Sequence, residues 1–296
     1  MVDSKNLGNF YRYVNKRLSH RDAIGALVDG SGNVITADED KANMFNSYYA
    51  SVGVIDNGCM SLCHDHKVHT TLDTITFTEA GVVAAITKLK PNLSSGPDNL
   101  PPLFLKKLKH SLARPLALLY NQLMSVCYVP DSWKSAIIIP VFKKGAAEKV
   151  DNYRPISLTC VAGKIMERLI AAEMYEHLRF NGLLSGAQHG FIKGKSTCTN
   201  LLECINDWTI ILQNRKSVTV AYIDFKKAFD TVSHGKLFAR LYSYGIRGQV
   251  LSWIKKLFYK PDSPDQNWMV ALSSSRLTEW CRPRQRSWAR LFSRLY

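Results

Sequence analysis

The chain has 296 residues, of which 46% are hydrophobic, and its 39 basic and 24 acidic side chains leave a net charge of +15. This length and hydrophobic content predict a globular protein with a sizeable core and exclude a disordered chain. The charge favours a polyanionic partner, most simply nucleic acid, over the alternative of a merely soluble basic protein.

No segment of the sequence is expected to cross a membrane or to direct secretion. The densest apolar run, residues 136–142, has the length of a strand and is interrupted by Pro140. The N-terminus lacks the hydrophobic stretch of a signal peptide, and the seven cysteines follow no regular disulfide spacing. We therefore expect an intracellular protein of the nucleus or cytoplasm, without a membrane partner.

Residues 1–70 are weakly patterned, and residues 1–75 are expected to form an N-terminal linker or extension. Residues 29–33, with the sequence Asp-Gly-Ser-Gly-Asn, predict a tight turn between short strands because glycine and asparagine tolerate a positive φ. A helix is expected over residues 37–52.

A group of cysteine and histidine residues lies near the end of this extension. Its members fall within eleven residues: Cys59, Cys63, His64, His66 and His69. Thiolate and imidazole groups at this density could bind zinc. A structural zinc site usually joins two pairs of ligands across an intervening element, and none separates these residues. Zinc binding and a polar surface loop both stay open, and the spacing favours the loop.

Helical periodicity becomes clear from residue 76. Thr76 and Glu79 have the spacing of a capping box, and the apolar residues that follow repeat at helical intervals as far as Pro91. The remaining elements expected in this part are helices over residues 103–127, 164–180 and 199–213, a strand over 136–142, and a strand or turn over 153–158.

The segment 218–225 is the most informative part of the chain. Its apolar and β-branched residues predict a buried strand that ends near Asp224. A carboxylate held there would be rigid and partly desolvated, which suits a hard divalent cation. The alternative is that Asp224 caps the turn that follows. Helices are expected over residues 234–244 and 250–258, and the irregular mixture of helices and strands indicates an α+β fold.

Basic residues follow the strand at 136–142. If the chain folds back after Lys143 and Lys144, Arg154 would converge with them, and lysine and guanidinium groups together suit a triphosphate. The alternative is an exposed basic hairpin tip.

The loop at residues 188–196 is a candidate for contact with nucleic acid. It offers an amide, a flexible backbone, an aromatic ring and two ammonium groups, from Gln188, Gly190, Phe191, Lys193 and Lys195. Such a loop can follow a nucleic-acid backbone through main-chain N–H groups and a stacking ring.

The order of several short motifs resembles a known family. The motifs are Gly96 to Asp98, Trp133 to Lys144, Asn152 to Leu158, Lys164 to Arg168, Gln188 to Phe191, and Asp224 to Asp230. Together they resemble the reverse transcriptase of non-LTR (LINE-type) retrotransposons over roughly residues 10–260, more loosely in the early part.

This resemblance implies a right-hand polymerase that is mostly helical with short antiparallel strands. Residues 76–214 would supply the fingers and residues 215–279 an incomplete palm. The partners implied are an RNA template, a DNA primer and deoxynucleoside triphosphates. The sequence does not indicate an oligomeric state.

The resemblance also implies roles for individual residues. Asp224 would be the first metal-binding aspartate of a site for two Mg²⁺ ions, which activate the primer hydroxyl and stabilise the leaving pyrophosphate. Lys143 or Lys144, with Arg154, would hold the incoming triphosphate. Phe229 would lie under its sugar and exclude a 2′-hydroxyl. The five loop residues given above would contact the template or primer.

The family pattern is incomplete toward the C-terminus. The family carries a paired Asp-Asp, usually in a Tyr-x-Asp-Asp motif, and no two aspartates are adjacent in this chain. Residues 280–296 instead hold five arginines and no acid. Shifting one possible coding sequence by one base gives a close match to the loop that precedes the motif in the family. We therefore interpret this tail as aberrant, frameshifted near Trp280 and truncated.

These observations lead to two main hypotheses. The first is a reverse transcriptase domain that is inactive as written, because Asp224 alone cannot hold two Mg²⁺ ions against hydration. The alternative is a non-catalytic remnant that binds RNA or DNA. An unrelated phosphate-handling enzyme is disfavoured, because charge alone would not produce the motifs in this order.

Overall fold

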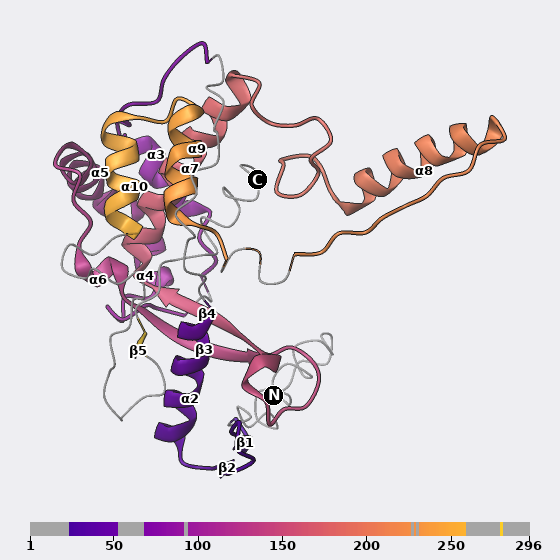
Figure 1. The fold of residues 1–296 in the computed structure, drawn as a ribbon. Coiled ribbons are helices and arrows are strands. Elements are labelled where there is room, and N and C mark those ends of the chain that lie inside the picture. Colours follow the sequence, from indigo (N-terminus) through magenta and orange to yellow (C-terminus); the bar gives the residue numbers. More distant parts are fainter. Residues whose placement is uncertain are drawn as a thin grey trace, which may run out of the picture. The chain divides into compact units, whose positions relative to one another are not determined.

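A computed structural model describes residues 24–52, 68–91, 94–225, 228, 231–258 and 279–280 (Figure 1). By their internal contacts the residues divide into two compact units. The first combines Met1–Tyr49 with Pro140–Ile156, and the second combines Ala50–Ile139 with Ser157–Tyr296. The zinc prediction falls outside the described residues except for His69, whose backbone N–H donates to Asn181 Oδ1.

The first unit begins with a small hairpin. Strands β1 (Leu27–Val28) and β2 (Val34–Ile35) pair antiparallel around the predicted turn. The Asp29 carboxylate accepts from the backbone N–H groups of Ser31 and Asn33, each at 2.8 Å, and from the Asn33 side chain at 2.9 Å. The Asn33 side chain and backbone hold the pKa of Asp29 below its usual value. The turn predicted at residues 29–33 is confirmed.

Helix α2 (Asp38–Ser51) confirms the helix predicted over residues 37–52. Its first turn carries three acidic residues, which stabilise the positive end of the helix dipole. Phe45 of this helix packs edge-on against Tyr153 at a centroid distance of 5.1 Å, and Tyr153 also meets Phe142 at 5.5 Å. An aromatic group therefore joins α2 to the segment 140–156 within this unit.

The second unit is mainly helical. Its helices are α3 (Glu79–Thr87), α4 (Pro102–Lys107), α5 (Lys109–Ser125), α6 (Asp131–Lys134), α7 (Val161–Phe180), α8 (Thr197–Gln213), α9 (His234–Ser243) and α10 (Gly248–Phe258). These bounds confirm the predicted helices to within a few residues. The predicted capping box is wrong: Thr78 is the N-cap of α3 and accepts from the Gly81 backbone N–H at 3.1 Å. Gly81 lies three residues after the cap and has no side chain to complete a box.

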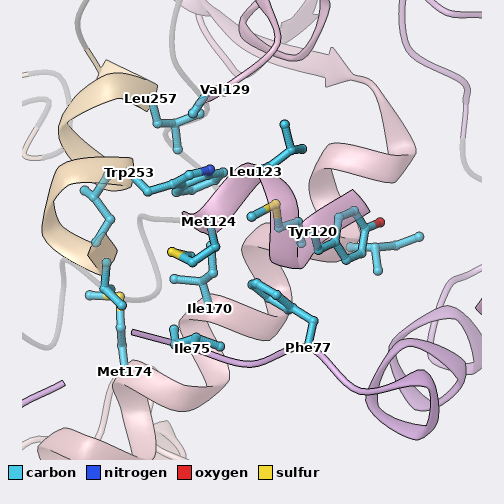
Figure 2. Close-up of a cluster of buried hydrophobic side chains, with 14 of the residues drawn as sticks. Ile75, Phe77, Tyr120, Leu123, Met124, Val129, Ile170, Met174, Trp253 and Leu257 are labelled. Carbon is cyan, nitrogen blue, oxygen red and sulfur yellow. The ribbon is translucent and has the colours of Figure 1, made fainter. Parts of the chain in front are cut away.

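The core of this unit lies between α3, α5, α7, α9 and α10 (Figure 2). Tyr120 is fully buried, and its hydroxyl donates to Ala162 O at 2.8 Å. The ring of Trp253 is also fully buried, and its Nε1–H donates to Tyr128 O at 3.2 Å. Both large rings therefore enter the core with their polar atoms satisfied, as buried donors require.

One three-stranded sheet has the strand order β4-β3-β5, formed by β3 (Ala136–Phe142), β4 (Tyr153–Thr159) and β5 (Glu279–Trp280). Strand β3 confirms the predicted bounds. It pairs antiparallel with β5, with Ala136 opposite Trp280. Next to β4, Gly96 lies so close to the backbone of Thr159 that a Cβ there would stand 2.4 Å from the Thr159 carbonyl carbon. Only glycine fits this approach without a shift.

The strand predicted over residues 218–225 is not formed. Residues 216–225 adopt no regular secondary structure, and Tyr222 is 87% exposed. A strand requires hydrogen-bonded neighbours, and no described residue pairs with this segment in a ladder. The mixture of helices with short antiparallel strands agrees with the α+β class. The assignment of these elements to fingers and palm stays a prediction.

No helix in the described part of the chain is long and apolar enough to span a membrane.

Candidate nucleotide and nucleic-acid interface

The chain folds back between β3 and β4, as the proposed triphosphate contact requires. The Lys143 backbone N–H donates to Asn152 O at 2.8 Å, and the Asn152 side chain donates to Ala146 O at 2.8 Å. Gly145 has a φ of +92°, and a Cβ there would meet the Asn152 side chain at 2.8 Å. Asn152 and Gly145 therefore shape the turn that carries the lysines.

The aromatic pair across this hairpin sets the direction of the basic side chains. Phe142 and Tyr153 contact each other, and Tyr153 is buried. Because successive side chains of a strand point to opposite faces, Arg154 lies on the face away from this pair, and Lys143 follows directly after the end of β3. Both are exposed, as is Lys144, and none of the ion pairs between described residues involves the three. Three cationic groups therefore project from one hairpin.

The predicted nucleic-acid loop is folded upon itself. Phe191 and Gly194 have positive φ values of 62° and 83°. The Gln188 side chain donates to Gly190 O at 3.2 Å, and the Lys195 ammonium donates to Gly186 O. Since an ammonium has three donors, Lys195 keeps two for a ligand.

The remaining members of this loop are accessible. Gly190, Phe191 and Lys193 are exposed, and a Cβ on Gly190 would meet nothing within 4 Å. The loop therefore presents backbone, an aromatic ring and an ammonium group on one short segment, which is the combination that its sequence predicts.

Sequence reasoning missed one residue of this loop, His189. The imidazole is buried and contacts Thr199 and Glu203 of α8. Its position between Gln188 and Gly190 was visible in the sequence, but its partners lie ten and fourteen residues away on a helix whose orientation the sequence does not specify. One related signal was available in the sequence. Ser196 and Thr199 have the spacing of a capping box, and they form one at the start of α8.

The prediction for the environment of Asp224 is wrong. Asp224 is exposed on the irregular segment 216–225 and is not desolvated at the end of a buried strand. No cluster of three or more histidine, cysteine, aspartate or glutamate side chains suited to a metal ion occurs in the described residues. Asp224 can supply one carboxylate, but Mg²⁺ in a two-metal site needs several, so the described residues do not fit a complete site. Phe229, Asp230 and residues 281–296 lie outside the described residues.

Comparison with known proteins places these segments within one family match. Residues 141–285 match the family described as reverse transcriptase (RNA-dependent DNA polymerase). This range contains Lys143, Lys144 and Arg154, the loop at 188–195 and Asp224.

Three relatives illustrate the similarity. The chain is 32% identical over 181 residues to a probable RNA-directed DNA polymerase from transposon BS of Drosophila melanogaster, covering 61% of this chain and 18% of that protein. It is 34% identical over 150 residues to the RNA-directed DNA polymerase from mobile element jockey of the same fly, covering 50% and 16%. It is 29% identical over 119 residues to a Pol polyprotein from the type-1 retrotransposable element R2 of Popillia japonica, covering 40% and 16%.

The chain spans less than a fifth of the length of these relatives. The family match and the names of these relatives nevertheless agree on a reverse transcriptase. Residues 141–285 therefore belong to the reverse transcriptase family, in the branch of the non-LTR retrotransposons.

Proposed function

We propose that this chain provides the substrate-binding part of an RNA-directed DNA polymerase domain. The observation that carries the proposal is the fold-back between β3 and β4, where the exposed Lys143, Lys144 and Arg154 all lie within the reverse transcriptase match. The arginine offers a planar pair of donors to phosphate oxygens, and each lysine adds a point charge. These groups suit the triphosphate of an incoming deoxynucleotide, with Phe229 proposed beneath its sugar.

The loop at residues 188–195 is proposed to hold the template or primer backbone. Lys193 and the free donors of Lys195 would contact phosphate groups, while Phe191 would stack on a base or sugar. Gly190 leaves room for close approach of a nucleic-acid backbone, since nothing lies within 4 Å of the position of its absent Cβ.

Mg²⁺ would be the cofactor of the family reaction, with Asp224 as one ligand. Because the sequence holds no adjacent pair of aspartates to join Asp224, we expect the 296-residue chain to bind its substrates without extending a primer. A non-catalytic RNA- or DNA-binding role is the second candidate, and the exposure of Asp224 favours it.

Nucleotide binding tests the hairpin directly. Arg154→Ala should weaken binding of a fluorescent deoxynucleoside triphosphate about tenfold, because charge-assisted hydrogen bonds are lost. Arg154→Lys should recover only part of the affinity, since lysine lacks the bidentate geometry. Arg114→Ala is the matched control: it removes the same charge from an exposed arginine of α5 in the other unit. Equal effects of Arg154→Ala and Arg114→Ala would reject the hairpin as the triphosphate site.

Primer extension tests the inactivity that both candidates share. The full chain, a labelled primer on an RNA template, the four deoxynucleotides and Mg²⁺ should give binding with a steep salt dependence and no extension. Extension that Asp224→Ala abolishes would overturn the expectation of inactivity. Absence of both binding and extension would reject both candidates.

A further inference from the structure

His189 is a buried polar residue inside an otherwise accessible loop. Its side chain is only 3% exposed, whereas the side chain of its partner Glu203 is 62% exposed. His189 Nε2 lies 2.9 Å from Glu203 Oε2, and His189 Nδ1 lies 2.8 Å from Thr199 Oγ1. Both nitrogens of one ring are therefore engaged by α8, and no role assigned above uses this arrangement.

The chemistry of the partners fixes how the ring is held. A carboxylate can only accept, so His189 Nε2 carries a proton and donates to Glu203. The Thr199 hydroxyl also lies 2.8 Å from Ser196 O and accepts from the Ser196 backbone N–H at 2.8 Å. The imidazole is thus connected to the capping box that begins α8. We name His189, Thr199 and Glu203 the His189 network.

Two attachment points determine the orientation of the ring and of the adjacent backbone. Thr199 and Glu203 are four residues apart, so they lie one turn apart on the same side of α8. A ring bonded at both nitrogens cannot rotate without losing one of these bonds. The residues on either side of it, Gln188 and Gly190, are proposed nucleic-acid contacts. Phe191 follows with a positive φ, a conformation that is unfavourable for a residue other than glycine and needs support from its surroundings.

We propose that His189 is a positioning residue, which holds the loop at residues 188–195 against α8 in a preformed conformation for nucleic-acid phosphate groups. The inference rests on the proposed function of this loop. Preforming the loop removes the entropic cost of ordering it when the ligand binds. Loss of the network should therefore weaken nucleic-acid binding although His189 itself is too buried to touch the ligand.

For Glu203→Ala, simple electrostatics and the proposed positioning role predict opposite changes in the affinity for nucleic acid. Removal of an acidic side chain from a basic protein should strengthen binding to a polyanion. Glu203→Ala should instead weaken binding of a fluorescein-labelled single-stranded RNA about five- to tenfold, because the His189 network is broken. Asp207→Ala, which removes an exposed acid from the same helix, is the matched control and should strengthen binding slightly. Equal strengthening by both substitutions would overturn the proposal.

Hydrogen exchange of backbone amides in the free protein measures how firmly the loop is held. His189→Leu and Glu203→Ala should both accelerate exchange over residues 186–196. Neither should shift the midpoint of thermal unfolding by more than Asp207→Ala does. His189→Gln, which keeps a donor toward Glu203, should restore part of the protection. Unchanged exchange in His189→Leu would show that the network does not hold the loop, and would overturn the proposal.

A double-mutant cycle distinguishes failure of the inference from failure of the proposed function. Lys193→Ala should weaken RNA binding and lower the salt dependence by about one phosphate contact. His189→Leu should have a much smaller effect in the Lys193→Ala background, because it acts by positioning the loop. If Lys193→Ala weakens binding and His189→Leu does not, positioning fails while the loop function stands. If neither substitution weakens binding, the proposed loop function is wrong as well.

Discussion

Helices α7 and α8 are both long and amphipathic, yet their environments differ completely. Nine of the 20 residues of α7 are buried, whereas none of the 17 residues of α8 is buried. Most apolar residues of α8 are exposed instead, with Leu202 at 66% and Leu212 at 59%. An amphipathic sequence therefore predicts a helix in both places, but burial depends on whether another element covers the apolar side.

The two helices also differ in what stabilises them. Isolated helices of this length are marginal in water, and most helical stability in proteins comes from packing. Helix α7 packs in the core with α3. Helix α8 relies on local interactions, namely the capping box of Ser196 and Thr199 and the bonds from His189. Substitutions should therefore act globally in the core and locally in α8.

The largest expected effect is in the core. Trp253→Ala removes a fully buried ring and its bond to Tyr128 O, and should lower the free energy of unfolding by about 3–5 kcal/mol in urea titrations. Leu202→Ala on α8 should change it by less than about 0.5 kcal/mol. Comparable losses from both substitutions would mean that α8 is buried against another element, and the contrast between the helices would disappear.

A glycine in each region gives the next largest contrast. Gly96→Ala places a Cβ 2.4 Å from the Thr159 carbonyl carbon, and the backbone must shift, so we expect a loss of about 1–3 kcal/mol. Gly190→Ala, in the loop before α8, meets open space and should leave global stability unchanged. Thermal denaturation of both variants measures the difference. A stable Gly96→Ala variant would refute the close packing beside β4.

Tyr120 makes core stability sensitive to alkaline pH. Burial raises the pKa of Tyr120 well above its ordinary value of 10.0. In the unfolded chain this phenol ionises near pH 10, while in the folded core it stays neutral. The stability it contributes is therefore full below about pH 10 and is lost as pH rises toward the folded value.

Tyr120→Phe tests this dependence. At neutral pH the variant should lose about 1 kcal/mol, because the hydrogen bond to Ala162 O is absent. Above pH 10 its stability should fall less steeply than that of the parent chain, as followed by urea midpoints across the pH range. Parallel pH profiles for the two proteins would contradict the buried, neutral phenol.

The smallest expected effect is confined to α8. Ser196→Ala removes the cap that accepts from the Thr199 backbone N–H and should destabilise the helix by about 1 kcal/mol. Because α8 buries no side chain, the global unfolding midpoint should stay constant while amide exchange in the first turns of α8 accelerates. A shift of the global midpoint would show that α8 unfolds together with the core.

Much of the fold could be predicted from the sequence, and the errors have physical causes. Strand β3 and the C-terminal ends of α5, α9 and α10 follow from apolar periodicity and from nearby turn residues. The capping box at Thr76 was misplaced by two residues because Thr76 and Thr78 both offer a hydroxyl and only one stands at the actual helix start. The strand at 218–225 was wrong because β-branched residues predict extended backbone, but a ladder also needs a neighbour.

The features of the candidate site were also predicted only in part. The sequence predicted Lys143, Lys144, Arg154 and the loop at 188–195 as binding groups, because their residue types and family motifs are local features. It did not predict that Asp224 is exposed or that His189 is buried. Burial depends on which segments meet, and those segments are distant in the sequence.

By itself, the sequence of this protein determined its helices, its basic charge and its kinship with reverse transcriptases, because periodicity, composition and motif order are carried along the chain. Only the tertiary structure decided which amphipathic helix is buried and that Lys143 bonds to Asn152 across the turn between β3 and β4. It also decided that the His189 network joins the loop to α8. These features arise from contacts between residues far apart in sequence, whose energies depend on partners, distances and desolvation.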